Sequence, residues 1–502
     1  MEKILKLGIC LFFAFIFITC ESWLDIKPAD RISGRELFET REGFIKALNG
    51  VYTGLNARSI YGREMTAGVL DIMAQYYSTN SNFHNALIQY NYEDDGSPSV
   101  KTTFDNIWST NYNLIINLNI IIEKCDDNKS VLNGIWYNLI KGEALALRAF
   151  LHLDLLRIFG PTYSTDPDGL YIPYITNSDQ SVSPLRSSKD ILVKDLTDAI
   201  ALLKESDPII ENGVMLSDSD DGDNSLRYRQ FRLNYYAARA LLARTYLWFE
   251  DKTNAYTTAK ELLNDIGETV FPFVSVDAVT QSTNPDRVFS SEVMFATYDN
   301  NRGSAIYDYY FSPTASYSGS FGENYLQMSY VGNVKWSGRI SQLFITESDI
   351  RYKAWLESYA PSNNSTELHY LTKYQVSPSN RPVHMYMIPL IRISEVYFII
   401  AECSTNFDEA KDYFSKIRVA RFAFDLESAN QGELMSNIEW EYRREFLGEG
   451  QMFYFYKRRE QQTIPAGDYP EVTEVLQMSK AQYIVPMPDS EANERVSTDK
   501  SN

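Results

Sequence analysis

Apolar residues recur at helical spacing over most of this chain, and this periodicity constrains the fold more than any other feature. Phe104, Ile107, Trp108, Ile115, Leu118 and Ile122 fall on one face of a predicted helix. A second, longer helix is predicted from Ile135 to Phe159, because Gly160-Pro161 then supplies a stop that a helix cannot continue through. A third is expected to be capped by Ser187 or Ser188 and to turn Ile191, Leu192, Leu196, Ala199 and Leu203 inward. These segments predict a mainly α-helical protein with little β-structure.

Two stretches read as pairs of adjacent helices. Residues 234–266 form a predicted hairpin, with Asn234 as the first cap and Asn254 as the restart of the second helix. Its small-residue face, made by four alanines between positions 237 and 243, lets a neighbouring helix approach closely. Ile391–Cys403 and Phe407–Arg421 make a second pair. Successive pairs with small contact residues predict a tetratricopeptide-like scaffold of degenerate helical repeats.

Two segments interrupt the helical pattern. Ile209–Arg232 is acidic and loop-like, and residues 267–390 are rich in Ser, Asn, Gly and Tyr with few periodic apolar positions. Loops of that length inside a compact protein are usually functional. We therefore expect a helical scaffold over about 35–266 and 390–460, with a loop-rich ligand region over about 267–389, all within one domain from 35 to 502.

The N-terminus reads as an export signal. Lys3 and Lys6 give a positive start, and Ile4–Ile18 is almost unbroken apolar sequence, too short for an ordinary bilayer span of about 20 residues. Cys20 stands at the end of the run, which predicts a lipoprotein signal over 1–19, lipid on Cys20 and a tether over 20–34. Ordinary secretion, or an uncleaved anchor with an incidental cysteine, remains the alternative.

Charge and composition exclude several classes of function. The formal net charge is −19, and such a surface repels nucleic acid, so no nucleic-acid partner is expected. The four histidines are scattered and form no zinc spacing, which predicts no metal site and no cofactor. Cys125 and Cys403 are the cysteines left beyond the signal, and the sequence leaves open whether they pair.

Aromatic side chains supply the candidate ligand site. The chain has 35 Tyr, 27 Phe and 7 Trp, and many cluster in the loop-like segments 71–92 and 298–336. Flat aromatic faces pack on sugar rings or on peptide side chains, while nearby polar groups bond hydroxyls or amides. The candidate contacts are Asp71, Tyr76, Tyr77, Phe83, Tyr90, Tyr92, Tyr298, Arg302, Tyr309 and Trp336. The alternative is that many of these rings are buried in the scaffold.

Two acidic clusters are candidate chemical sites. Ser217–Asn224 lacks the ligand spacing of a calcium loop, because aligning its glycine puts Tyr228 where a bidentate acid belongs. Glu439, Glu441, Glu445 and Glu449 alternate with basic residues, so helical ion pairs are favoured over the acid pair of a glycoside hydrolase. Further ion pairs are expected between Arg392 and Glu395 or Glu402, and between Arg148 and Glu143.

Seven motifs in order resemble the SusD/RagB family of Bacteroidetes nutrient-binding outer-membrane lipoproteins. They are Cys20–Asp30, Leu48–Tyr52, the set Trp108, Tyr112, Ile115 and Asn119, then Gly142–Gly160, Ala237–Leu247, Pro389–Glu402, and Glu441–Arg458 with Tyr483–Pro488. The resemblance implies a non-enzymatic, lipid-anchored protein on the outer face of the outer membrane. It further implies a SusC-type TonB-dependent transporter as partner, and an oligosaccharide or a peptide as ligand.

Overall fold

The computed structural model describes residues 34–79, 81–96, 98–164, 166, 172–179, 185–267, 269–313, 324–328, 343–344, 346–359, 368–377, 381–423, 426–466 and 475–491. The long helices are α3 (Arg41–Gly54), α6 (Val100–Asp127), α7 (Trp136–Phe159), α8 (Lys189–Lys204), α10 (Tyr235–Trp248), α11 (Lys252–Ile266), α15 (Ile393–Cys403), α16 (Phe407–Ala420) and α17 (Gln431–Glu445). Short helices are α2 (Gly34–Leu37), α4 (Val69–Met73), α5 (Asn82–Ile88), α9 (Ile209–Asn212), α12 (Val276–Thr280), α14 (Ile350–Trp355), α18 (Met452–Arg458) and α19 (Lys480–Tyr483).

Strands and tighter or wider helical turns fill the connections. The strands are β1 (Pro173–Tyr174), β2 (Leu185–Arg186), β3 (Val293–Tyr298), β4 (Leu356–Tyr359), β5 (Leu368–Leu371), β6 (Met387–Arg392), β7 (Thr463–Pro465) and β8 (Val475–Gln477). The 3-10 turns are η1 (Arg229–Phe231), η2 (Ser290–Glu292) and η5 (Val383–Tyr386), and η3 (Gly303–Phe311) is a π-helix. The described strands form four two-stranded antiparallel sheets, so the prediction of a mainly helical fold with little β-structure is confirmed.

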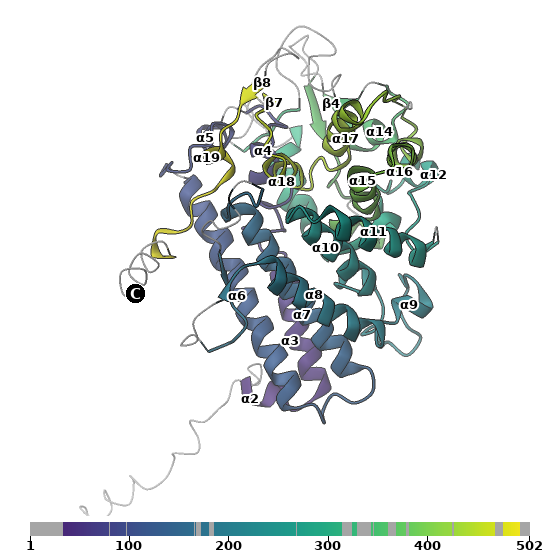
Figure 1. Ribbon diagram of the computed structural model, residues 1–502. Coiled ribbons are helices and arrows are strands. Elements are labelled where there is room, and N and C mark those ends of the chain that lie inside the picture. The colour runs from purple at the N-terminus through teal and green to yellow at the C-terminus, as the bar shows by residue number, and fades with distance from the viewer. Residues whose placement is uncertain are drawn as a thin grey trace, which may run out of the picture.

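The long helices form an array in which each packs on the next. Contacts run from α6 to α7, α8, α10, α11, α15 and α16 in that order, and Figure 1 shows this path from the lower helices to the upper right. Strands β4, β7 and β8 lie toward the top of the same view, together with α4, α5 and α18. Stacked neighbouring helices bury a continuous apolar interior, as helical-repeat scaffolds do. The predicted helical array is therefore what the described residues build.

Local signals placed several helix ends correctly. The Asn234 side chain accepts hydrogen bonds from the main-chain N–H groups of Tyr236 and Ala237, at 3.1 and 3.0 Å, and so caps α10. Helix α7 ends at Phe159, as the Gly160-Pro161 stop predicted. The second helix of the hairpin differs, because Asp251 caps α11 and the helix starts at Lys252, not at Asn254.

The described parts of the loop-rich region contain more secondary structure than expected. Strand β3 pairs antiparallel with β6, with Tyr298 opposite Met387 and Val293 opposite Arg392. This pairing takes Ile391 and Arg392 into a strand, so the predicted helix from Ile391 starts at Ile393 instead. The π-helix η3, α14 and the β4–β5 hairpin also lie in this region. Long-range pairing, which helical periodicity cannot reveal, is the reason for the difference.

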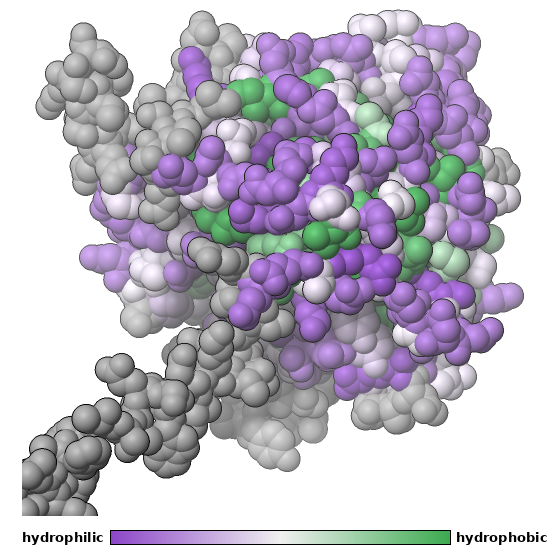
Figure 2. Space-filling view, turned by 90° about the horizontal axis from the view of Figure 1, so that it is seen from below, coloured by the Kyte–Doolittle hydropathy of each residue, from purple (hydrophilic) through white to green (hydrophobic). Residues whose placement is uncertain are grey.

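One large apolar core joins most elements, and a smaller cluster holds α15, α16 and α17 together. Cys125 and Cys403 are both free and buried, which answers the question of their pairing. On the face seen from below, Figure 2 shows mostly hydrophilic residues with hydrophobic ones in small, interrupted areas. That distribution agrees with the strongly acidic composition.

The predicted ion pairs formed with other partners. Arg148 pairs with Asp195 at 2.7 Å, while Glu143 receives Arg229 at 2.6 Å. The carboxylates expected to bind Arg392 are likewise taken by other cations: Glu395 by Arg244, and Glu402 by Arg458 and Arg459. In each case the carboxylate pairs with an arginine from another element, because helix packing places that guanidinium closer than the arginine expected from the sequence.

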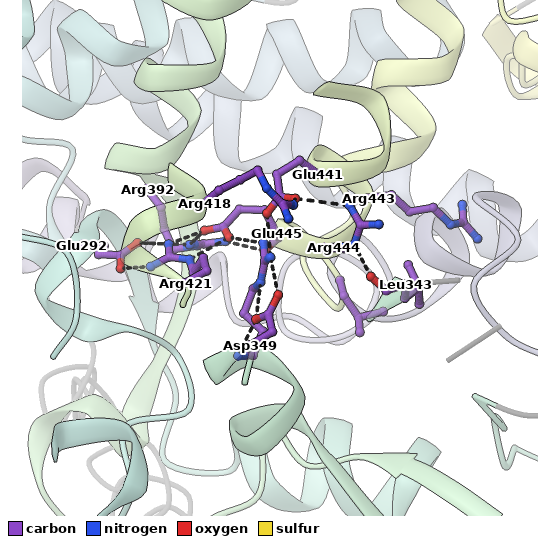
Figure 3. Close-up of polar contacts among 12 residues, drawn as sticks. Glu292, Leu343, Asp349, Arg392, Arg418, Arg421, Glu441, Arg443, Arg444 and Glu445 are labelled. Carbon is purple, nitrogen blue, oxygen red and sulfur yellow. Dashed lines mark hydrogen bonds and ion pairs between the residues drawn. The ribbon is translucent and has the colours of Figure 1, made fainter. Parts of the chain in front are cut away.

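Arg392 belongs to a buried network of arginines and carboxylates (Figure 3). Its guanidinium lies 2.6 Å from Glu445 and 2.9 Å from Glu449, and Arg421 joins Glu445 to Glu292. Burial opposes ionisation of Glu445, yet the surrounding guanidinium groups hold its pKa well below the usual range. The acids of this segment therefore tie α16, α17 and β6 together. Of the helical pairs predicted here, the structure shows Arg444 with Glu441 at 3.2 Å, whereas Glu445 and Glu449 pair with cations from other elements.

Candidate functional site

The two aromatic segments singled out in the sequence meet in space. The main-chain N–H of Ser78 donates to the carbonyl of Gln327 at 3.0 Å, and Gln327 returns the bond to Ser78 at 3.0 Å. Beside this bridge the rings of Tyr77 and Phe311 have centroids 5.5 Å apart. The segment after α4 and the segment after η3 therefore lie side by side, although they are far apart in the chain.

Asp71, a predicted ligand contact, is instead an internal anchor. It is fully buried on α4, where its carboxylate accepts main-chain hydrogen bonds from Gly448 at 2.6 Å and Gly450 at 2.9 Å. The hydroxyl of Tyr77 adds a third bond at 3.2 Å. Burial raises the pKa of Asp71 to about 7, while the bonds from the two glycines act in the opposite direction. Asp71 thus fixes the turn after α17, where Gly448 and Gly450 have φ of 79° and 68°.

Most of the other predicted contacts also use their polar groups in hydrogen bonds inside the protein. The hydroxyls of Tyr76, Tyr90 and Tyr92 donate to the carbonyls of Arg443, Met73 and Gln482, at 2.5, 2.6 and 2.6 Å respectively. Arg302 is buried and donates to the carbonyls of His384 at 2.8 Å and Met387 at 2.5 Å. Tyr76, Tyr77 and Tyr90 are buried rings of the core. Their burial argues against direct contact with a ligand and favours the scaffold alternative for this group.

Two of the predicted aromatics reach the surface together. Phe83 on α5 and Tyr309 on η3 are half-buried, and buried His84 and Tyr310 connect them. Ring centroids are separated by 5.3 Å from Phe83 to His84, 5.9 Å from His84 to Tyr310 and 4.8 Å from Tyr310 to Tyr309. The result is a continuous aromatic layer whose two ends face outward. We call Phe83, Tyr309 and the neighbouring Arg63 the Phe83–Tyr309 surface.

Arg63 is the functional candidate that the sequence did not reveal. Its guanidinium carbon lies 3.9 Å from the centre of the Tyr309 ring, and its Nε donates to Glu64 at 2.7 Å. The hydroxyl of Tyr310 donates to the same Glu64 at 2.9 Å. Arg63 lies in a turn-rich segment without any motif, so only its position across from η3 identifies it. A partly exposed guanidinium beside aromatic rings provides donors for hydroxyl or carbonyl oxygens.

The remaining predicted residues lie elsewhere. Tyr298, at the end of β3, is 44% exposed and lines a separate cavity. Trp336 and Cys20, the predicted lipid site, lie outside the described residues. Among the residues that the structure describes, no cluster of His, Cys, Asp and Glu is arranged to hold a metal ion. Within the same residues, no helix combines the length and apolar character needed to cross a membrane.

The chain matches two sequence models of one family. Residues 22–212 match the model described as "Starch-binding associating with outer membrane", and residues 250–496 match the model described as "SusD family". A SusD-like protein, P38, from Formosa agariphila is 24% identical over 481 residues, and the match covers 86% of each chain.

Solved structures agree with this assignment at the level of the fold. A SusD superfamily protein from Bacteroides thetaiotaomicron has a TM-score of 0.68 and 22% identity, with 90% of this chain and 98% of that chain covered. A SusD-like carbohydrate binding protein from Bacteroides vulgatus has a TM-score of 0.65 and 21% identity, with 90% and 96% covered. The family consists of non-catalytic binding proteins associated with the outer membrane. By the two sequence matches that together span most of its length, the chain belongs to the SusD family.

Proposed function

We propose that this protein captures oligosaccharides at the cell surface and delivers them to a SusC-type TonB-dependent transporter in the outer membrane. In this proposal lipid on Cys20 holds the protein on the outer leaflet, and residues 20–34 act as its tether. The bound nutrient is not transformed, and no cofactor takes part. The observation that carries the proposal is the Phe83–Tyr309 surface, which unites two aromatic segments in a member of a sugar-binding family.

The chemistry of that surface suits a sugar. The exposed ends of Phe83 and Tyr309 offer apolar ring faces to the C–H faces of a pyranose, and Arg63 offers hydrogen-bond donors to its hydroxyls. The aromatic layer beneath holds both rings in place, so little side-chain entropy is lost on binding. A peptide with apolar side chains would meet the same groups, and peptide binding is therefore the alternative outcome that the experiment must separate.

Titration calorimetry with defined ligands tests the proposal. The purified full-length protein in detergent is titrated with maltoheptaose, laminarihexaose, xylohexaose and mannohexaose, and separately with a mixture of peptides. The variant Phe83→Ala/Tyr309→Ala is compared with wild type. We expect its affinity for the bound oligosaccharide to fall about tenfold or more, because two stacking faces are removed.

Phe422→Ala is the matched control, because Phe422 is an aromatic residue 57% exposed at the end of α16 and outside the proposed surface. It should bind as wild type does. Unchanged affinity of the double variant would reject this surface as the site, and binding of peptides alone would replace the oligosaccharide with a peptide ligand.

Lipidation and partnership need tests of their own. Metabolic labelling with a fatty acid should mark wild type and not Cys20→Ser, and the labelled protein should appear at the cell surface. Co-purification from detergent-solubilised outer membranes should recover a large transporter with wild type. Unlabelled wild type, or its recovery from the cytosol, would overturn the anchored receptor.

A further inference from the structure

A cavity of about 610 Å³ shares no residue with the Phe83–Tyr309 surface. Helix α3, the end of β3, η5 and the acidic loop before η1 surround it. Its volume falls within the range of small-molecule sites, roughly 300–1,000 Å³. The lining residues that matter here are Asn56, Arg227, Phe231, Arg232, Tyr298 and Tyr386.

One wall of the cavity is a fixed aromatic platform. The rings of Tyr298 and Tyr386 are stacked, with centroids 4.9 Å apart and planes inclined by 20°. Phe231 meets Tyr298 edge-on at 5.2 Å and 83°. The carbonyl of Tyr298 accepts a hydrogen bond from Asn56 Nδ2 at 2.6 Å, which holds the main chain as well. Tyr298 is nevertheless 44% exposed, so a pre-organised ring remains available to a ligand.

Three polar side-chain atoms of residues that line the cavity make no hydrogen bond within the protein. Thr297 is 3% exposed, and its Oγ1 makes no hydrogen bond to the protein, nor does Asn56 Oδ1. Arg232 Nη1 also lacks a hydrogen bond, and it lies 3.9 Å from a carboxylate oxygen of Glu143. Unpaired buried polar groups cost roughly 1–3 kcal/mol each, so native proteins rarely keep them without a purpose. The three atoms belong to residues that line the cavity, so its wall carries polar as well as aromatic groups.

The charges around the cavity favour a neutral ligand. Arg227 donates to the carbonyl and the hydroxyl of Ser217 at 3.0 and 3.3 Å, so its bonds are to uncharged groups. Asp218 also lines the cavity and accepts from Tyr228 at 2.7 Å and from Asn224 at 2.8 Å. A carboxylate in the wall disfavours phosphate or sulfate, and the two arginines disfavour a cation. A sugar ring has an apolar C–H face and hydroxyls that both donate and accept, which matches this lining.

We propose that this cavity is a second carbohydrate site, which binds one or two neutral hexose residues with a ring stacked on Tyr298. It goes beyond the function proposed above, because it adds a site independent of the Phe83–Tyr309 surface. Arg227 and Asn56 line the polar side of the cavity and meet the hydroxyls at the rim of the stacked ring.

The two sites are distinguished with short neutral ligands, by testing Tyr298→Ala both alone and together with Phe83→Ala/Tyr309→Ala. Maltotriose, laminaritriose and mannotriose are titrated into wild type, Tyr298→Ala, Phe83→Ala/Tyr309→Ala, and the combination of all three substitutions. Binding is followed by calorimetry and by saturation-transfer NMR on the full-length protein. We expect the Phe83→Ala/Tyr309→Ala variant to keep a trisaccharide site, and the added Tyr298→Ala to weaken that site about tenfold or more.

Tyr298→Phe is the matched control, because it keeps the stacking ring and removes only the hydroxyl. It should bind within about twofold of wild type. Thermal unfolding of each variant checks that the fold is intact, and Phe422→Ala controls for loss of an exposed ring.

The outcomes distinguish the two sites. If Tyr298→Ala leaves trisaccharide affinity unchanged in both backgrounds, the cavity is not a sugar site, whatever the Phe83–Tyr309 surface does. If the Phe83→Ala/Tyr309→Ala variant is unchanged while Tyr298→Ala weakens binding, the cavity stands and the first surface fails. Absence of binding of all three trisaccharides to wild type overturns the cavity as a site for neutral hexoses.

Discussion

The guanidinium of Arg63 lies over the ring of Tyr309, 3.9 Å from its centre. This contact joins the turn after α3 to the π-helix η3, and Glu64 strengthens it by accepting hydrogen bonds from both Arg63 and Tyr310. A cation over an aromatic face contributes about 0.5–2 kcal/mol, depending on its exposure to solvent. Arg63 therefore positions Tyr309 as well as offering donors of its own.

Replacing Arg63 with alanine should loosen Tyr309 and remove those donors. We expect the affinity for the bound oligosaccharide to fall about three- to tenfold, and the free energy of unfolding to fall by about 1 kcal/mol. Calorimetry and urea unfolding measure the two effects. Arg63→Lys keeps the positive charge but loses the planar group, so its affinity and stability should lie between those of wild type and Arg63→Ala. Equal affinity of all three proteins would contradict the assigned role.

His152 should make the stability depend on pH. Its Nδ1 lies 2.9 Å from the carbonyl of Arg148, and its Nε2 accepts from the main-chain N–H of Ile175 at 3.0 Å, so both nitrogens are committed in the neutral ring. Burial lowers its pKa to about 3. The unfolded chain therefore binds more protons between about pH 6.5 and 3. The neutral His152 ring contributes to the free energy of unfolding above this window, and the contribution is lost as the pH falls through it.

The comparison that isolates this term is wild type against His152→Asn. Urea unfolding at several pH values should show the wild-type advantage shrinking by about 2 kcal/mol from pH 7 to pH 5, since one pKa unit corresponds to about 1.4 kcal/mol. Parallel stability curves for the two proteins would show that His152 is not held neutral.

The buried triad of Arg229, Glu143 and Asp207 should be sensitive to loss of its cation. Arg229 lies 2.6 Å from Glu143 and 2.9 Å from Asp207, and all three side chains are almost fully buried. Arg229→Met leaves two carboxylates without their partner, and the free energy of unfolding should fall by about 3–5 kcal/mol. Lys194→Met removes an exposed ion pair with Asp198 and should cost less than about 1 kcal/mol. Similar losses in both variants would contradict the role of burial.

Cys125 and Cys403 should resist thiol reagents in the folded protein. Both are free and buried, and burial raises the pKa of each thiol to about 12, so little reactive thiolate forms near neutral pH. Ellman's reagent should label them slowly under native conditions and fully in guanidinium chloride. Cys125→Ser and Cys403→Ser assign each signal, and rapid native labelling of either residue would contradict its placement.

The sequence located the helices but not their partners. The cap at Asn234 and the stop at Gly160-Pro161 depend on hydrogen bonds within a few residues, so local patterns sufficed to find them. The pairing of β3 with β6 depends on residues far apart in the chain, and no local pattern marks it. For the same reason the ion-pair partners predicted for Arg392 were wrong, because Glu445 and Glu449 reach it from another element.

The candidate site shows the same division. Aromatic composition singled out two segments, and the structure brings them together at Ser78 and Gln327. It did not separate Phe83 and Tyr309, which reach the surface, from Tyr76 and Tyr90, which lie in the core. Amino-acid order by itself determined the helical class and the family, because short-range periodicity indicates the helices and short motifs indicate the family. Only the tertiary structure decided which rings meet solvent, because burial depends on contacts between segments that the sequence keeps apart.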